Sequence, residues 1–220
     1  MGTDQGDSTE EQVPRGTSNS RAEVARLLRV AQHIGHLGPG EVDDHIDHAM
    51  VQAEVGSPQS GERWFDLGSG AGLPGLIFAL DWEVEMFLVD RSGARCDFLR
   101  NSVEELDLAD RVLVIEGDAT EVARDPRYRG SADGVCARAF GSPAALAECA
   151  APLLCTGGRL VVSEPPGRTN RWPSAGLALV GMGPATLNLG PPAMSLIQQV
   201  EVCPETFPRR WARLKKQPLF

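Results

Sequence analysis

The feature that most constrains this chain is a short apolar segment that leads into four glycines within eight residues, from Trp64 to Gly75. Glycine at the first three of these positions lets the backbone take positive φ and leaves no Cβ between the loop and a ligand. The apolar segment Leu76–Leu80 predicts a helix, whose free N–H groups would point at whatever lies over the loop. Strand, glycine loop and helix together predict the first unit of a nucleotide-cofactor fold.

Two cofactors fit such a loop. Gly70, Gly72 and Gly75 have the spacing of the dinucleotide fingerprint, which would indicate NAD. However, Gly68 already ends the strand, and Asp66 stands two residues before it, which looks like motif I of the class I S-adenosylmethionine (SAM) methyltransferases. A nearby carboxylate suits a cationic sulfonium and repels a pyrophosphate, so SAM is favoured. A glycine turn that only packs a helix on a sheet is the remaining alternative.

Strands and helices alternate after this loop. Strands rich in valine and leucine, separated by helices, predict a parallel sheet covered on both faces, of the α/β doubly wound, Rossmann-like class. We expect seven strands and a short N-terminal helical segment. The expected strands cover residues 64–67, 85–90, 112–118, 133–138, 159–163, 176–180 and 195–202, and the expected helices 76–80, 91–106 and 144–154.

Charged residues stand at the carboxyl ends of four expected strands, at Asp66, Asp90, Asp118 and Arg138. Ligands of such sheets bind beyond the carboxyl ends of the strands. Asp90 lies 22 positions after Gly68, a separation that suits a carboxylate accepting hydrogen bonds from both hydroxyls of a ribose. Asp118 and the backbone after it are expected to hold an adenine.

These residues also carry a family resemblance. The chain resembles the RsmG (GidB) methyltransferases over roughly residues 63–158 and the last dozen residues. The resemblance is carried by residues 66–75, 88–90 and 138–140, by Arg95 with residues 98–100, and by the tail 207–219. That family methylates guanine N7 in 16S ribosomal RNA. The resemblance implies SAM as cofactor, held in the glycine loop, after the third strand and at the end of the fourth. The full expected cofactor set is Asp66, Gly68, Gly70, Gly72, Leu73, Asp90, Asp118, Ala119, Thr120 and Arg138.

The chain departs from the family pattern on the side where RNA is expected. A histidine-x-x-aspartate-serine element is reduced to His45, because His48 and Ala49 replace its last two residues. Ser163 stands where a lysine usually follows the fifth strand, and Ala94 where a basic residue is common. Two alternatives therefore stay open: a SAM-dependent methyltransferase acting on a small molecule, and a non-catalytic SAM-binding protein.

Charge is distributed unevenly along the chain. The net charge is −9, whereas nucleic-acid binders tend to be basic, yet residues 159–220 hold eight basic and three acidic residues, including both lysines. Such a patch can contact a few phosphates of 16S rRNA or the small ribosomal subunit. The expected RNA contacts are Arg209, Arg210, Lys215 and Lys216. A solvated C-terminal tail is the alternative.

The expected chemistry asks for no catalytic residue. Methyl transfer from a sulfonium is an in-line displacement that depends on alignment and desolvation. Guanine N7 offers a free lone pair, so no general base is assigned. An acceptor that must lose a proton would need one, for which His45 and Glu164 are the candidates.

We expect a monomer in the cytoplasm. The five cysteines are scattered, as expected of core residues in a reducing compartment, and the four histidines lack the spacing of a metal site. The sequence contains no run of about 18 apolar residues, the length that would indicate a membrane span. We expect a disordered acidic tail over 1–20, a helical segment over 21–60, and over 61–220 a SAM-binding methyltransferase domain with a basic tail.

Overall fold

Seven strands form one sheet in the computed structural model, which describes residues 18–167, 171–188 and 190–220. Their order across the sheet is β3-β2-β1-β4-β5-β7-β6; β1 to β5 are parallel, and β7 is antiparallel to β5 and β6. The predicted α/β class is confirmed. The strands are β1 Arg63–Leu67, β2 Glu85–Asp90, β3 Val112–Glu116, β4 Ala132–Ala137, β5 Leu154–Ser163, β6 Thr186–Asn188 and β7 Met194–Gln198.

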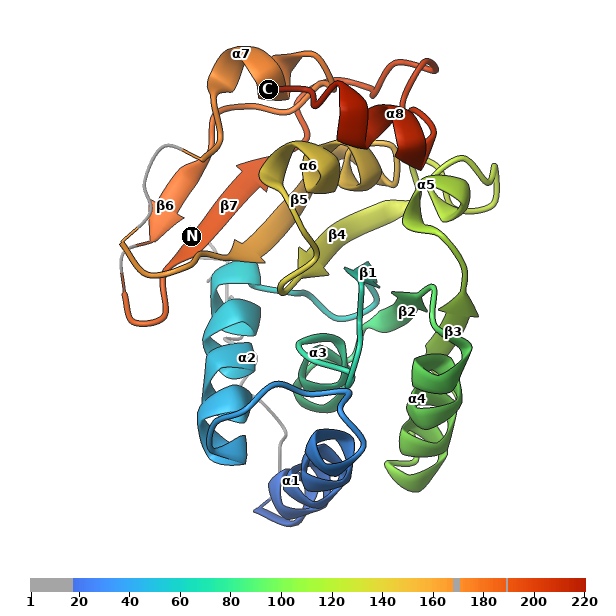
Figure 1. Cartoon of the computed structure of the whole chain (residues 1–220), viewed down its shortest axis with the longest axis vertical. Helices are drawn as coiled ribbons and strands as arrows, with labels where there is room; N and C mark the ends of the chain where they lie inside the picture. Colours follow the sequence, from blue (N-terminus) through green and yellow to red (C-terminus); the bar gives the residue numbers. More distant parts are fainter. Residues whose placement is uncertain (1–17, 168–170, 189) are drawn as a thin grey trace, which may run out of the picture.

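Helices cover both faces of this sheet (Figure 1). Helices α1 to α4 pack on one face, and α5 to α8 lie on the other, as the two clusters of buried side chains also indicate. The helices are α1 Ser18–His33, α2 Val42–Gly56, α3 Gly75–Asp81, α4 Gly93–Glu105, α5 Ala119–Val122, α6 Pro143–Ala150, α7 Ser174–Ala178 and α8 Trp211–Lys216. Within the described ranges, none of them is long and apolar enough to span a membrane.

Neighbouring residues of β1 show how one strand serves both cores. Successive side chains of a strand point to opposite faces. Trp64 packs against Phe78 of α3, with ring centroids 4.9 Å apart, whereas Phe65 stacks on Phe87 of β2 at 4.5 Å. Both β1 side chains are wholly buried. Both faces of the strand are therefore buried, as expected for a sheet covered on both faces.

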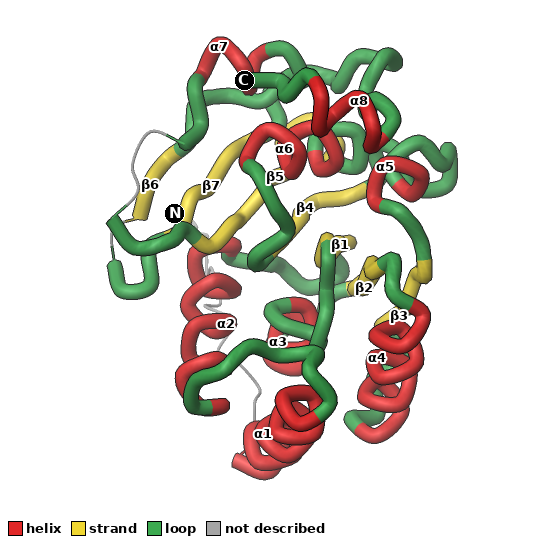
Figure 2. Tube along the Cα trace, in the orientation of Figure 1, coloured by secondary structure: helices red, strands yellow, loops and turns green. Residues whose placement is uncertain are grey.

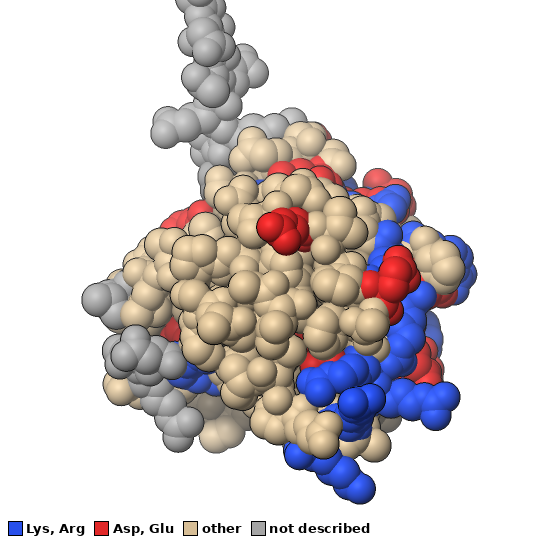
Figure 3. Space-filling model, turned by 90° about the horizontal axis from the view of Figure 1, so that it is seen from above, with Lys and Arg blue, Asp and Glu red and all other residues tan. Residues whose placement is uncertain are grey.

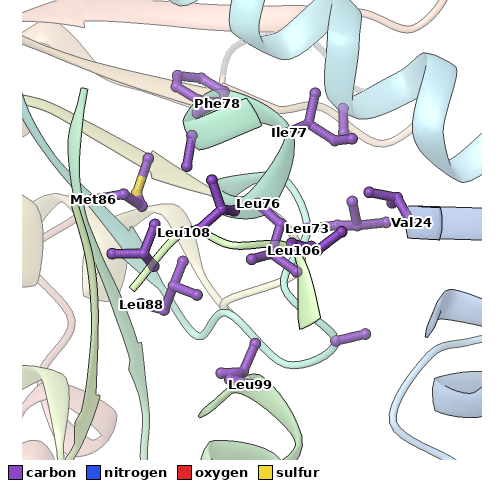
Figure 4. Close-up of a cluster of buried hydrophobic side chains, with 14 of the residues drawn as sticks. Val24, Leu73, Leu76, Ile77, Phe78, Met86, Leu88, Leu99, Leu106 and Leu108 are labelled. Carbon is purple, nitrogen blue, oxygen red and sulfur yellow. The ribbon is translucent and has the colours of Figure 1, made fainter. Parts of the chain in front are cut away.

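The core around α3 also anchors the glycine loop (Figure 4). Leu73, from the loop itself, lies in the same cluster as Leu76 of α3, Leu88 of β2 and Leu99 of α4. A Cβ on Gly72, whose φ is +93°, would lie 2.3 Å from Leu76 Cδ1. Gly72 is therefore required by packing as well as by its backbone conformation.

The N-terminal segment forms a helix pair against the sheet. Helix α2 is tied to the sheet by Gln52, whose buried amide donates to the carbonyls of Ala137 (3.0 Å) and Val161 (3.1 Å). Of the expected tail over 1–20, residues 18–20 belong to the first turn of α1, and residues 1–17 lie outside the described residues.

Two expectations for the C-terminal half are wrong. Residues 176–180 do not form a strand, because α7 occupies Ser174–Ala178 and the sixth strand lies at 186–188. Leu177 and Val180, three residues apart, are both wholly buried, which fits a helical turn. A short apolar run does not by itself distinguish strand from helix. The last strand is also shorter than expected, ending at Gln198 because the antiparallel pairing with β5 ends there.

The strand order creates a crevice at one edge of the sheet. The chain runs from β1 outward to β2 and β3, then returns to place β4 on the other side of β1. The connections that follow β1 and β4 therefore leave in opposite directions. The crevice in which such folds bind ligands opens between the carboxyl ends of these two strands.

Candidate active site

The glycine loop is fastened to the end of β2. The N–H groups of Gly68 and Ser69 both donate to the carbonyl of Val89, at 2.9 and 3.0 Å. Gly68 and Gly70 have φ of +73° and +58°, which glycine adopts without strain. The Gly70 N–H donates to Asp90 Oδ2 at 3.0 Å. The loop and Asp90 are thereby held in one fixed arrangement.

Asp90 lies at the mouth of this arrangement with acceptor capacity to spare. Its Oδ1 accepts from the Ser92 N–H at 2.9 Å, and the Arg95 guanidinium is 3.7 Å from Oδ2. Each carboxylate oxygen has two lone pairs, so both oxygens can accept a further hydrogen bond. Asp90 keeps 5% of its surface exposed, so a bound group can still reach these remaining lone pairs.

Asp118, after β3, caps the short helix α5. Its Oδ1 accepts from the Thr120 N–H at 2.8 Å and from the Thr120 hydroxyl at 2.6 Å. Thr120 is buried, so its contribution is to fix the carboxylate and the Ala119 backbone beside it.

These groups line a first hollow, of about 260 Å³. Of the expected cofactor residues, Gly68, Asp90, Asp118 and Ala119 lie in its wall. Side chains outside the expected set complete the lining: Arg91, Arg95, Phe140 and Trp211. Carboxylates beside aromatic rings suit a nucleoside, which has ribose hydroxyls and a planar base.

A second hollow, of about 320 Å³, lies on the other side of Gly68. It is lined by Gly70 and Leu73 from the glycine loop, by Arg138 after β4, and by residues 36–38 of the α1–α2 loop, which runs beside the glycine loop (Figure 2). Arg138 donates to the His45 carbonyl at 3.3 Å, and its Nη2 is 2.6 Å from His45 Nδ1. A fixed guanidinium here suits the carboxylate of an amino-acid group.

Asp66 and Gly72 lie behind the hollows rather than in their walls. Asp66 is wholly buried, and its Oδ2 accepts from the Ser69 hydroxyl (2.7 Å) and the Gly75 N–H (3.0 Å). Burial raises its pKa to about 6, against the lowering effect of these two hydrogen bonds. Asp66 therefore shapes the loop from inside, like Gly72, instead of facing a ligand.

A third hollow, of about 330 Å³, lies beyond the ends of β4 and β5. It shares Arg138, Ala139 and Phe140 with the other two, and Ala139 lines all three. Ala139 has φ of +58°, a backbone conformation that is strained for a residue with a Cβ and is frequent at functional sites. The three hollows therefore meet at one short segment after β4.

Two departures from the family pattern contact each other in the third hollow. His48 Nε2 lies 2.7 Å from Ser163 Oγ. Burial, together with the charges of Arg138 and His45, lowers the pKa of His48 to about 4. The pair is therefore uncharged at neutral pH, at the two positions where the family pattern has an aspartate and a lysine.

Both residues considered as general bases are already engaged. Glu164 is buried; its Oε1 accepts from Trp172 Nε1 (2.5 Å) and the Ser195 hydroxyl (2.8 Å), and its Oε2 from Arg171 (2.5 Å). His45 holds Arg138, as described above. Glu164 is therefore occupied by three donors, and His45 lines the second hollow and not the third.

The expected RNA-contact residues fall into two groups. Arg209 is bound inside the fold: its guanidinium makes two hydrogen bonds, of 2.7 and 2.6 Å, to the wholly buried Glu148. Arg210, Lys215 and Lys216 are exposed, and the exposed Arg213, which the expected set omits, lies among them on α8. The tail therefore has an anchor at Arg209 and a basic surface after it.

The family described as rRNA small subunit methyltransferase G (GidB) matches residues 24–164. The chain belongs to this family. Similar relatives carry the name ribosomal RNA small subunit methyltransferase G: that of Desulfitobacterium hafniense is 34% identical, over 79% of this chain and 77% of its own. That of Mycolicibacterium gilvum is 32% identical over 90% of each chain.

A solved methyltransferase from Geobacter sulfurreducens shares the fold of this family member, with a TM-score of 0.60 over 86% of this chain and 91% of its own, at 14% identity. The family establishes the enzyme class: the protein is a SAM-dependent methyltransferase. The sequence expectation of family, cofactor and class is confirmed.

Sequence reasoning missed several residues of the site. Ala139 and Phe140 belong to a segment that carried the resemblance, so their position after a strand was a usable signal. The α1–α2 loop gave no signal, because only the packing of α1 and α2 places residues 36–38 beside the glycine loop. Trp211 lies in a basic tail far along the chain, where nothing in the sequence connects it to Asp90.

Proposed function

We propose that the protein transfers the methyl group of SAM to guanine N7 of 16S ribosomal RNA. The adenosine would occupy the first hollow, the methionine part the second, and the target base the third. When bound, the cofactor supplies an electrophilic methyl group. The relatives' names and the family support ribosomal RNA as the substrate class.

The residues of the first two hollows fit the donor. Asp90 has free acceptor capacity for the ribose hydroxyls, Asp118 and the Ala119 backbone lie where the adenine edge would be, and Arg138 offers a cation to the carboxylate. The close approach at Gly68, where a Cβ would come within 3.0 Å of Phe140 Cδ2, keeps the loop and the Phe140 ring together at the junction.

The observation that carries the choice of acceptor is the state of the candidate bases. Glu164 and His45 are bound to other groups, and His48 has a pKa of about 4, too low to accept a proton efficiently at neutral pH. Of the two candidates that line the third hollow, Glu164 is bound to three donors and His48 has a pKa too low for a base at neutral pH. Guanine N7 needs no deprotonation, so this environment suits it better than an amine, a phenol or a carboxylic acid.

The third hollow also suits a planar base. Phe140 and Trp172 lie in its wall, and the uncharged pair of His48 and Ser163 offers hydrogen-bonding groups without a buried charge. Its volume of about 330 Å³ leaves room for a purine extruded from its strand, as base-modifying enzymes require.

The basic surface of α8 would meet the RNA backbone. In the view from above, lysine and arginine side chains gather along the right-hand side of the molecule (Figure 3). The proposed contacts are Arg210, Arg213, Lys215 and Lys216, each able to neutralise a phosphate. We propose that the protein works as a monomer in the cytoplasm, where ribosomal subunits are available.

The test is transfer of a tritiated methyl group from SAM to small ribosomal subunits isolated from cells that lack this modification. We expect label in 16S rRNA, recovered as N7-methylguanine after digestion to nucleosides. Fully modified subunits are the matched control and should take up no label. Label in a small molecule alone would indicate the small-molecule alternative, and binding without any transfer would indicate a non-catalytic protein.

A second measurement addresses the RNA contacts. Arg210, Lys215 and Lys216 replaced together by alanine should weaken RNA binding and lower its logarithmic salt dependence by about 2–3 units, because each phosphate contact contributes about 0.9. The affinity for S-adenosylhomocysteine should not change. An unchanged salt dependence would make α8 a solvated helix and remove it from the interface.

A further inference from the structure

Trp211 places helix α8 in the wall of the first hollow. It lines that hollow together with Asp90, Asp118 and Phe140. Its ring meets the Phe140 ring edge to face, with centroids 6.1 Å apart and planes at 82°. Two aromatic rings therefore stand beside the two carboxylates that suit a nucleoside.

The chain just before Trp211 is held firmly. Arg209 is clamped on the buried Glu148, and its backbone N–H donates to the same carboxylate at 2.7 Å. Arg124 donates to the Pro208 carbonyl at 2.6 Å, and Arg129 to the Phe207 carbonyl at 2.8 Å. The position of Trp211 at the hollow is therefore fixed by the fold and not by a free tail.

The indole N–H of Trp211 is buried and has no hydrogen-bond partner among the described residues. The other tryptophan near the site, Trp172, has its N–H paired with Glu164. An unpaired donor shielded from water is costly. A rotation of the ring toward the hollow would give it an acceptor on a nucleoside, which carries ring nitrogens and hydroxyl oxygens.

Trp211 also contacts the basic surface. The Lys215 ammonium lies 5.9 Å from the centroid of the indole ring, and Arg210 directly precedes Trp211 as the N-cap of α8. One residue therefore joins the cofactor hollow to the helix proposed to meet RNA.

We propose that Trp211 is a cofactor-contacting residue whose indole packs against the nucleoside of SAM and donates its N–H to it. This inference rests on the proposed function, which puts the adenosine in the first hollow. It makes α8 a wall of the cofactor site as well as a carrier of RNA contacts.

The experiment titrates the full chain with S-adenosylhomocysteine and follows tryptophan fluorescence and calorimetric heat. The parent protein is compared with Trp211→Phe and with Trp82→Phe, the control at the end of α3 that lines none of the three hollows described. We expect the parent and Trp82→Phe to show the same affinity and the same change in emission. Trp211→Phe should bind about two- to tenfold more weakly and lose most of that change.

A second variant, Trp211→His, keeps a ring N–H donor and should recover part of the affinity lost in Trp211→Phe. Parental affinity and an unchanged emission response in Trp211→Phe would overturn the inference and leave Trp211 as a packing residue, while the proposed function stands. A parent protein that does not bind S-adenosylhomocysteine would overturn the proposed cofactor site and this inference with it.

Discussion

The first hollow takes its glycine loop and its two carboxylates from the ends of three neighbouring strands, whereas the acceptor side is built from elements far apart in the chain. Gly68, Asp90 and Asp118 each lie at or just after the end of β1, β2 or β3. The third hollow instead combines His48 of α2, Ser163 of β5 and Trp172 of the segment after it.

The two sides also differ in charge. The first hollow is lined by carboxylates and arginines; in the third, Glu164 and Arg171 are paired with each other and the His48–Ser163 pair is uncharged at neutral pH. Cofactor recognition depends on groups of fixed charge that follow strands directly. In the proposed function, the acceptor would meet the neutral hydrogen-bonding pair of His48 and Ser163.

The largest effect is expected from removing Arg209, the anchor that holds the C-terminal tail against the fold. Arg209→Ala leaves the wholly buried Glu148 carboxylate without its partner, and should lower the free energy of unfolding by about 3–5 kcal/mol. Arg210→Ala, one residue further and exposed, is the matched control and should change it by less than about 0.5 kcal/mol. Urea denaturation measures both. An Arg209→Ala protein of parental stability that has lost RNA affinity would return Arg209 to the RNA contacts.

The next effect isolates the cofactor side. Asp90→Ala should weaken binding of S-adenosylhomocysteine by about 1–3 kcal/mol, because the ribose hydroxyls lose their acceptor. Asp97→Ala removes an exposed carboxylate of α4, paired only with Arg100 among the described residues, and should leave the affinity unchanged. Calorimetry compares the two. Equal affinity in both variants would exclude Asp90 from the cofactor site.

A smaller effect isolates the acceptor side. Ser163→Phe adds a ring to the third hollow and should slow methyl transfer to small ribosomal subunits by about tenfold or more, equivalent to ~1.4 kcal/mol. Binding of S-adenosylhomocysteine should remain parental, since Ser163 lines neither of the other hollows. Leu187→Phe, on the exposed edge strand β6, is the control. A parental transfer rate in Ser163→Phe would place the acceptor elsewhere.

The last effects concern pH, and the contributions of His48 and Asp66 to stability should have opposite signs. His48, with its pKa lowered from 6.5 to about 4, takes up its proton more readily when unfolded, so its contribution makes stability rise with pH across this window. Asp66, with its pKa raised from 3.8 to about 6, binds its proton more tightly when folded, so its contribution makes stability fall with pH between those values.

Unfolding measured from pH 4 to 7 checks both signs. Relative to the parent, His48→Gln should gain stability as pH falls toward 4, and Asp66→Asn should gain it as pH rises toward 6. Each substitution keeps a group that can make the hydrogen bonds of the original side chain. Differences that do not depend on pH would mean that neither group changes its pKa on folding.

The sequence allowed prediction of the fold and of Gly68, Asp90, Asp118 and Ala119 in the wall of the first hollow, because those features are local. A glycine loop after an apolar strand, and an acid at the end of each of the next two strands, need no information from elsewhere in the chain. Where local patterns were ambiguous, as at 176–180, prediction failed: burial of Leu177 and Val180 in a helical turn depends on neighbours that the pattern does not contain.

By itself, the sequence determined the α/β class, the family and the cofactor, since strand periodicity and motif spacing are properties of short segments. Only the tertiary structure decided which residues share a surface. It placed His48 against Ser163, buried Asp66 behind the glycine loop, clamped Arg209 on Glu148 and brought Trp211 to the hollow of Asp90. The physical reason is that residues as far apart in the chain as His48 and Ser163, separated by 115 positions, meet only through the packing of helices on both faces of the sheet.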